Sequence, residues 1–171
     1  APLLVSSPTD YVGVPLAPPS IEFWFGTNGQ GQDVFAQTIH GARKTLFIAV
    51  LSGLLVVAVG GLIGGVAGYF GGRIDDFLSL LINVFLLLPG LPLMVILAAW
   101  LPPGPLTIIM VLVFTGWAWH ARVLRSQVMA FRKQDFVYAS KVSGESNLRI
   151  ITVEILPRML SLMTSSFIGA T

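Results

Sequence analysis

Two long runs without a formal charge constrain this chain more than any other feature. No Asp, Glu, Lys or Arg occurs between Lys44 and Arg73, or between Asp76 and Arg122. About 20 apolar residues in a helix suffice to cross the roughly 30 Å hydrocarbon core of a bilayer. Only 11% of all residues are charged, against about 25% in soluble domains. The sequence therefore predicts an all-α, polytopic transmembrane protein.

The second charge-free run is long enough for two crossings if the chain turns midway. The proline-rich stretch 101–105, LPPGP, supplies that turn because proline lacks an amide hydrogen and clashes with the preceding helical turn. We expect full spans at about 45–69, 77–100 and 106–124. The apolar run within 158–171 is too short to cross, and we expect it to be the truncated start of a fourth span in a fragment.

Lysine and arginine determine the expected orientation. Seven of the ten lie between Arg122 and Arg158, and the positive-inside rule places that segment in the cytoplasm. Residues 1–44 are then an extracytoplasmic lead-in and amphipathic segment. Residues 45–171 form the transmembrane domain, with 125–157 as its cytoplasmic loop.

Prolines and glycines dominate the outer region. The prolines of residues 1–21 predict an extended, poorly ordered chain. A glycine-rich turn, from Gly26 to Gly31, then leads to Asp33, which is placed to cap a short amphipathic helix. The glycine spacing matches neither G-x-x-x-x-G-K-[ST] nor a strand-borne G-x-G-x-x-G, so turn chemistry is favoured over a nucleotide site.

Small residues and prolines mark two features of the spans. Glycines recur every four positions in the first span, as in helices that pack closely in lipid. Packing is favoured over a ligand site, and the predicted packing residues are Gly60, Gly61, Gly64, Gly65 and Gly68. In the second span Pro89, Gly90 and Pro92 should kink the helix. This site is a candidate gate hinge or a simple bend.

Intramembrane charges, metal-ligand spacings and catalytic motifs are missing from the sequence. Ion-coupled carriers usually place ionisable residues within the bilayer, so energy coupling by an intramembrane ion is disfavoured. His120 has no ligand-type neighbour at metal-binding spacing and is favoured as an interfacial anchor over a metal ligand or base. Without a nucleophile elbow, H-E-x-x-H or paired carboxylates, we expect neither an enzyme nor a metal site. The modest net charge of +2 gives no case for nucleic-acid binding.

A polar stretch, FVYASKVSGESNLRIITVEILP at 136–157, interrupts the apolar sequence. It predicts two short helices, 135–143 and 145–156, separated by a glycine suited to a left-handed turn. In the second helix, Leu148, Ile151 and Ile155 form one apolar stripe. These residues alone fit an amphipathic helix on lipid headgroups as well as a docking element.

The polar stretch resembles the EAA loop of ABC-importer permeases, whose pattern is E-A-A, three residues, G, nine residues, then I-x-L-P or a close variant. Ala139 stands at the second position and Gly144 at the glycine, and Ile155, Leu156 and Pro157 close the pattern. Tyr138 replaces the glutamate and Ser140 the second alanine.

Other motifs extend the resemblance from about residue 22 to the end. They are similar, in order, to the dipeptide, oligopeptide and nickel branch: FGTNGQGQDVFAQTIHGAR, GVAGYFGGRIDD, FLLLPGLPL, the W-x-x-x-A-R of Trp117 to Arg122, and ASKVSGESNLRII. Asn28 and Gln32 replace an acidic and a basic residue of the first motif.

The resemblance implies a type I ABC-importer permease fold in the cytoplasmic membrane of a prokaryote. It implies a permease for dipeptides or oligopeptides, with nickel and other solutes left open. The implied partners are a second permease subunit, two cytoplasmic ATPase subunits and an extracytoplasmic substrate-binding protein, besides the bilayer. ATP and Mg would bind the ATPases, with no cofactor in this chain.

The implied ATPase-coupling residues are Tyr138, Ala139, Ser140, Gly144, Leu148, Ile151, Ile155, Leu156 and Pro157. Since tyrosine replaces the glutamate, we expect apolar seating of Leu148, Ile151 and Ile155 in an ATPase groove to matter more than a charge contact. Two other functions are kept: a non-transporting scaffold whose loop binds lipid or a regulatory partner, and a channel or ion-driven carrier. The sequence identifies neither the substrate nor the residues that line its path.

Overall fold

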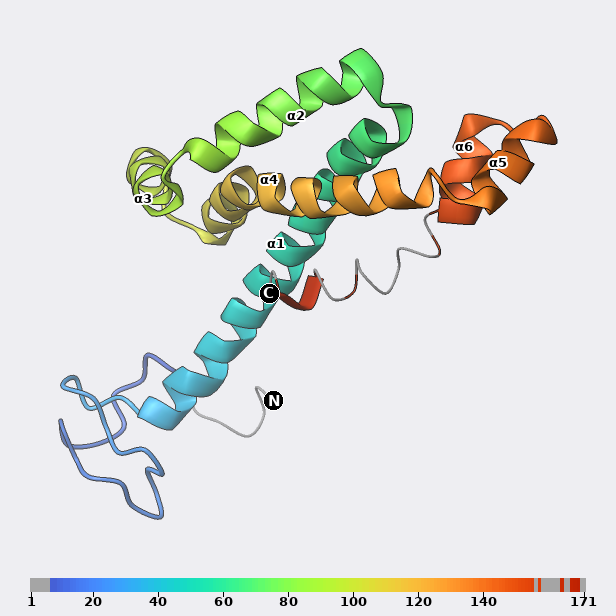
Figure 1. The fold of residues 1–171 in the computed structure, drawn as a ribbon. Coiled ribbons are helices and arrows are strands. Elements are labelled where there is room, and N and C mark those ends of the chain that lie inside the picture. Colours follow the sequence, from blue (N-terminus) through green and yellow to red (C-terminus); the bar gives the residue numbers. More distant parts are fainter. Residues whose placement is uncertain (1–6, 156, 158–163, 165–166, 170–171) are drawn as a thin grey trace. The chain divides into compact units, whose positions relative to one another are not determined.

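The structure, a computed structural model, describes residues 7–155, 157, 164 and 167–169. Within those residues every regular element is a helix (Figure 1). This confirms the all-α fold that the charge-free runs predicted.

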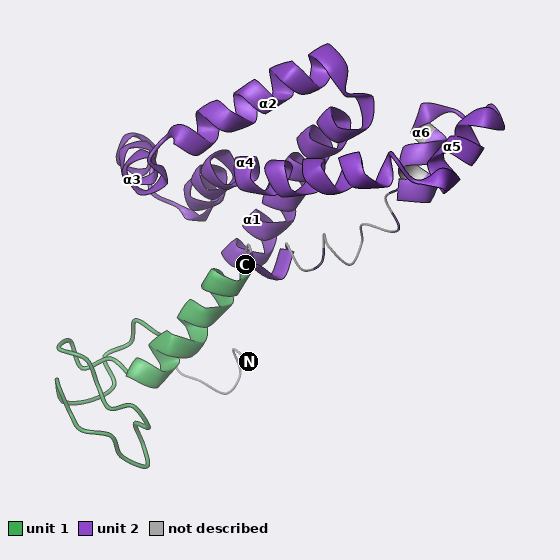
Figure 2. Cartoon of the chain, viewed as in Figure 1, with its two compact units in different colours: residues 1–47 green, residues 48–171 purple. Residues whose placement is uncertain are grey.

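Two compact units make up the chain, Ala1–Phe47 and Ile48–Thr171 (Figure 2). Helix α1 (Val34–Phe70) contributes residues to both. It starts after Asp33, whose Oδ1 accepts a hydrogen bond from the Phe35 amide at 2.9 Å, as expected of a helix cap. The sequence predicted this cap but separated a short helix from the first span. The two form one helix because no proline interrupts α1.

Side-chain amides organise the first unit. The Oε1 atom of Gln32 accepts hydrogen bonds from Asn28 at 2.9 Å and from Gln37 at 2.8 Å. Gln37 also donates to the carbonyl of Pro8, and Gln32 to that of Thr9. The expectation of a poorly ordered lead-in is therefore wrong for residues 7–21. Prolines there donate no hydrogen bond, but their carbonyls still accept one.

Two turn positions of the first unit favour glycine because of their backbone conformation and close backbone contacts. Gly26 has φ +70° and Gly31 has φ +73°, values that a residue with a Cβ atom rarely adopts. A Cβ atom at Gly26 would collide with the Ala17 carbonyl oxygen. Thr27 ties this turn further, because its hydroxyl donates to the Val14 carbonyl and accepts from the Ala17 amide.

Helices α2 (Gly72–Leu87) and α3 (Gly90–Trp100) replace the single span predicted at 77–100. Their axes are bent by 83°. Leu88 is extended, with ψ 133°, because the residue before a proline is disfavoured in the helical region. The predicted kink at Pro89 is thus a full break between two helices.

Helix α4 (Pro105–Phe131) is longer than the predicted span, which ended at Leu124. The loss of apolar character after that residue does not end a helix, because Arg and Lys are good helix formers. After α4 come α5 (Asp135–Val142), the single turn α6 (Asn147–Arg149) and a π-helical turn η1 (Ile150–Ile155).

Helices α1 and α4 are each long and apolar enough to cross a bilayer, and α2 with α3 would provide a third crossing as one bent span. Large apolar side chains such as Leu62, Leu91 and Trp100 are exposed on them, as expected where lipid replaces water as the solvent. The predicted fourth span, 158–171, lies largely outside the described residues.

Candidate functional site

Residues 135–155, comprising α5, α6 and η1 and called the polar segment below, turn at Gly144. This glycine has φ +78°, in the left-handed region that commonly ends a helix. Its amide donates to the Lys141 carbonyl at 3.1 Å, and the Glu145 amide donates to the Ser140 carbonyl at 3.1 Å. The predicted turn at Gly144 and the first helix, α5, are therefore present, whereas the predicted second helix, 145–156, is a single α-helical turn, α6, followed by the π-helical turn η1.

The second half of the polar segment starts with a capped turn. Ser146 Oγ accepts a hydrogen bond from the Arg149 amide at 3.3 Å, and Glu145 pairs with the Arg149 guanidinium at 2.9 Å. The helix then widens into η1 at Ile150. A π-helical turn changes which side chains share a face, but Ile151 and Ile155 of the predicted stripe still contact the same buried cluster.

One face of the polar segment is buried against α1 and α4. Val137, Ile150 and Ile155 are at most 2% exposed and form a cluster with Tyr69, Leu124 and Val128. Ile151 is partly buried against that cluster. Ile155 therefore packs inside this chain and Ile151 is partly covered by the same cluster, while the coupling role of these residues stays a prediction.

The opposite face of α5 presents large apolar side chains. Tyr138 is 57% exposed and Val142 is 89% exposed, and residues four positions apart in a helix lie on the same face. Val153 of η1 is 56% exposed. Exposed apolar side chains that gather on one face commonly mark a contact surface.

The remaining predicted coupling residues have mixed positions. Ala139 and Pro157 are exposed, whereas Ser140 is partly buried and donates to the Phe136 carbonyl at 3.0 Å. Leu156 and the side chain of Leu148 lie outside the part of the chain that the structure describes.

Tyr69 joins the buried face, and the sequence reasoning did not identify it. Its hydroxyl donates to Asn147 Oδ1 at 2.8 Å, and Lys141 Nζ lies 5.4 Å from its ring centroid. An aromatic residue with a polar tip at the end of an apolar helix was the available signal. Its partners 72 and 78 positions along the chain could not be read from local spacing.

Three of the predicted packing glycines contact α4. A Cβ atom at Gly60 would lie 2.9 Å from the Trp117 carbonyl oxygen, and one at Gly68 would lie 2.7 Å from that of Arg125. Gly64 approaches the Ala121 carbonyl more closely still. Close approach of two backbones is the role that small residues have in membrane helix pairs.

The other two glycines of the set face an apolar cavity. Gly61 and Gly65 line a space of about 350 Å³, together with Tyr69, Ile151, Ile155 and further apolar residues of α1 and α4. A Cβ atom at Gly65 would meet nothing within 4 Å. The glycine set therefore has two faces, one packed and one open.

Polar side chains join α2 to α4. Asp75 receives two hydrogen bonds from Arg125, one of them from Nη2 at 2.7 Å, and a third from Ser79 at 3.1 Å. Arg122 donates to Asn83 Oδ1 at 2.6 Å. The aspartate is buried, and a buried carboxylate is stable only when paired and hydrogen-bonded in this way.

Pro89, Gly90 and Pro92 stand at the α2 to α3 break, and their role as a hinge remains a prediction. His120 Nδ1 lies 3.2 Å from the Gly116 carbonyl oxygen. Among the described residues no group of three His, Cys, Asp or Glu side chains could hold a metal ion.

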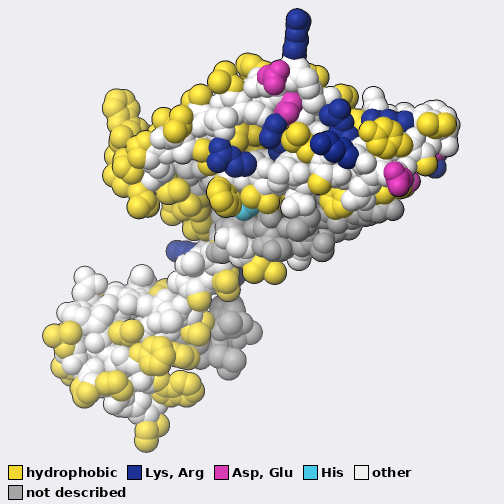
Figure 3. Space-filling view, viewed as in Figure 1, with side chains coloured by type: hydrophobic (Ala, Val, Ile, Leu, Met, Phe, Trp, Pro, Cys, Tyr) yellow, Lys and Arg dark blue, Asp and Glu magenta, His cyan; other side chains and the backbone are white. Residues whose placement is uncertain are grey.

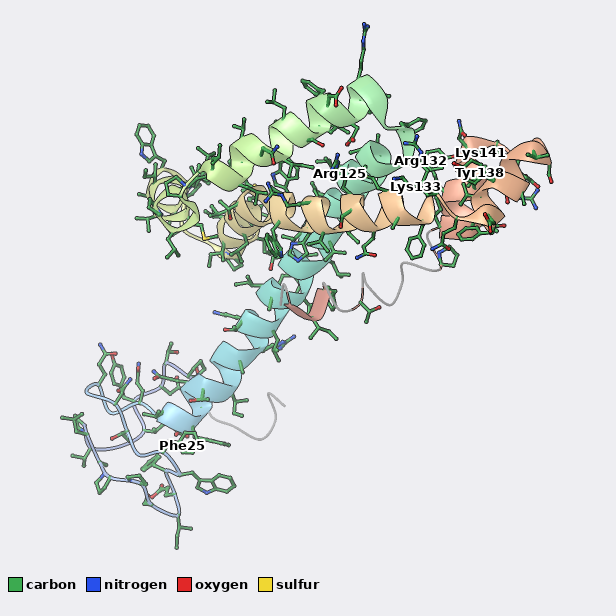
Figure 4. All side chains as sticks on the ribbon, viewed as in Figure 1. Phe25, Arg125, Arg132, Lys133, Tyr138 and Lys141 are labelled. Carbon is green, nitrogen blue, oxygen red and sulfur yellow. The ribbon has the colours of Figure 1, made fainter. Side chains whose placement is uncertain are left out.

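Lysine and arginine side chains gather on one face of the second unit (Figure 3). Arg132 and Lys133 follow α4, and Lys141 lies on α5 beside Tyr138 (Figure 4). Helix α5 therefore carries a cation, Lys141, between the exposed Tyr138 and Val142 in sequence.

Residues 60–170 match a protein family described as "Binding-protein-dependent transport system inner membrane component". The match begins in α1 and includes the whole polar segment.

Individual proteins are also similar to this chain. The dipeptide transport system permease protein DppC of Bacillus subtilis is 43% identical over 143 residues, which cover 84% of this chain and 45% of that protein. The oligopeptide transport system permease protein OppC of the same organism is 35% identical, with 84% and 47% covered. The nickel transport system permease protein NikC of Escherichia coli is 32% identical, with 87% and 55% covered. The chain spans about half the length of these relatives.

Proposed function

Because this chain belongs to the binding-protein-dependent transport system inner membrane components, in the dipeptide, oligopeptide and nickel branch of ABC-importer permeases, we propose that it forms part of the translocation path of an ATP-driven importer. The apolar helices α1 to α4 are its membrane part. ATP and Mg bind separate ATPase subunits, two per importer. A second permease subunit and an extracytoplasmic binding protein complete the assembly.

The observation that carries the coupling proposal is the two-sided polar segment. Its inner face packs on α1 and α4, while Tyr138 and Val142 project from its outer face. An exposed apolar pair on a helix can seat in a partner's groove, and a buried inner face holds that helix firmly. We assign ATPase docking to the Tyr138 and Val142 face, in place of the stripe predicted from the sequence.

Charge supports a cytoplasmic position for the polar segment. Arg132, Lys133 and Lys141 lie in or next to it, and cytoplasmic loops of membrane proteins are enriched in such residues. Together with the family description, this supports a prokaryotic cytoplasmic membrane, with the polar segment on the side where ATP is available.

The proposal for the transported solute rests on the relatives, whose names specify dipeptide, oligopeptide and nickel transport. We propose a dipeptide or oligopeptide, because the dipeptide and oligopeptide permeases of Bacillus subtilis have higher identities than the nickel permease. Nickel is the alternative cargo.

A test of docking uses Tyr138→Asp and Val142→Asp in the full-length permease. Each places a charge in the proposed apolar contact, so we expect the ATPase subunits to co-purify poorly and ATP hydrolysis by the complex to fall. Gln134→Asp is the matched control, since Gln134 is exposed directly before α5. Unchanged ATPase binding by both variants would rule out this docking face.

The second candidate function is a non-transporting scaffold that holds lipid at the polar segment. Tyr138 and Lys141 lie three positions apart on α5, which favours it, because tyrosine and lysine are common at headgroup depth. If cells whose protein lacks residues 138–155 still show ATP-dependent uptake, this segment does not couple ATP hydrolysis to transport. That result would support the scaffold and contradict the importer proposal.

A further inference from the structure

Tyr69 contacts both halves of the polar segment. Its hydroxyl donates to Asn147 of α6, and its ring faces the ammonium group of Lys141 of α5. The 5.4 Å from Lys141 Nζ to the ring centroid is within the roughly 6 Å at which a cation is attracted to an aromatic face. The two helices on either side of Gly144 therefore meet at one side chain of α1.

One side of the Tyr69 ring is packed and the other lines the apolar cavity described above. Tyr69 is 4% exposed and belongs to the cluster with Leu124 and Val128 of α4 and Ile155 of η1. Because the cavity leaves room on one side, packing alone does not fix the ring. The hydrogen bond to Asn147 and the contact with Lys141 therefore connect Tyr69 directly to α6 and α5.

Beyond Tyr69 the chain leads directly to the junction of α1 and α2. Gly71 and Gly72 have φ +67° and +56° and form that junction. The Asp75 amide then donates to the Gly71 carbonyl at 3.3 Å, and the Asp75 carboxylate holds Arg125 of α4. A shift at the end of α1 is thus connected to both α2 and α4.

We propose that Tyr69 is the positioning residue that fastens the polar segment to α1, so that movement imposed on α5 and α6 by a docked ATPase is passed to the membrane helices. This inference rests on the proposed function, because an ATPase must move the segment. For packing in the apolar cluster, the aromatic ring of Tyr69 alone would be enough. The hydroxyl adds a directional bond to Asn147 that packing does not need.

The test removes that bond from either side. Tyr69→Phe keeps the ring and deletes the hydroxyl, while Asn147→Ala deletes the acceptor at an exposed position. In the full-length permease assembled with its ATPases, hydrogen exchange is measured with and without ATP and vanadate. The measured response is the ATP-dependent change in exchange at residues 60–72, relative to that at 135–155.

In the wild type we expect both stretches to respond. In either variant the polar segment should still respond, while the α1 response falls about two- to tenfold, the size of one hydrogen bond's contribution. The double variant should match the single variants, since all three lose the same bond. A purely structural role would change exchange with and without ATP equally.

Failure of the Tyr69 proposal and failure of the proposed function would give different results. If the wild type responds in both stretches and Tyr69→Phe does so equally, the role of Tyr69 is refuted while ATPase docking stands. If the polar segment of the wild type shows no response to ATP and Tyr138→Asp still binds the ATPases, the proposed function fails and this inference fails with it.

Discussion

Two stretches, residues 7–33 of the first unit and the polar segment of the second, keep their shapes by different means. In the first, buried Thr27 and Gln32 hydrogen-bond to the surrounding backbone and side chains. In the second, buried Val137, Ile150 and Ile155 pack against α1 and α4.

Residues 7–33 keep their shape by contacts within the first unit, whereas the polar segment depends on packing against the membrane helices. Hydrogen bonds within residues 7–33 come from the stretch itself and the start of α1, and the rings of Trp24 and Phe25 also contact that of Phe35. The polar segment has its position set by the membrane helices beneath it. A segment that transmits force benefits from the second arrangement, since packed contacts connect it to its support.

The largest expected effect is a charge in the apolar cluster. Val137→Asp should lower the local free energy of unfolding of the polar segment by about 3–5 kcal/mol, because the carboxylate is buried without a partner. Hydrogen exchange of residues 135–155 measures this free energy. Tyr138→Asp, one position along the same helix but exposed, should change the local free energy of unfolding by less than about 0.5 kcal/mol. Equal effects would mean that the cluster does not hold the segment.

The second-largest expected effect concerns the packing of α1 against α4, which supports the polar segment. Gly64→Ala should push α1 from α4 and cost about 1–3 kcal/mol by overpacking, raising exchange in the polar segment but not in residues 7–33. Gly65→Ala is the matched control, because a Cβ atom there meets open space. Equal thermal stability of the two variants would contradict the two-faced glycine set.

A smaller effect is expected in the first unit. Thr27→Val keeps the side-chain shape but leaves the Val14 carbonyl and Ala17 amide without this partner, which should cost about 1–2 kcal/mol. Exchange at residues 13–18 should rise while that of the polar segment stays constant. Thr38→Val, which removes an exposed hydroxyl bonded within its own helix, should have almost no effect.

The smallest effect concerns the amide pair of Asn28 and Gln32. Asn28→Asp combined with Gln32→Arg replaces a neutral hydrogen bond by an ion pair, for a net change below about 1 kcal/mol that salt should weaken. Either change alone should be worse than the double change, because it leaves mismatched partners. Additive effects in a thermal-unfolding cycle would show that the two side chains do not interact.

Local signals in the sequence predicted a good part of this structure. The cap at Asp33, the break at Pro89 and the turn at Gly144 each depend on neighbouring residues, and each is present. Order in residues 7–21 was not predicted, because its hydrogen bonds come from Gln32 and Gln37 farther along the chain. The inward position of Ile155 was also missed, since an apolar stripe does not say what covers it.

The sequence by itself determined the membrane-spanning character, the turn positions and the family of this protein, because charge-free length, backbone preference and motif order are properties of neighbouring residues. Only the tertiary structure decided that Ile155 packs inward, that Tyr138 points outward and that Tyr69 joins Asn147. These outcomes depend on contacts between residues far apart in the chain. Periodicity predicts that a face is apolar, and the packed neighbours decide what that face contacts.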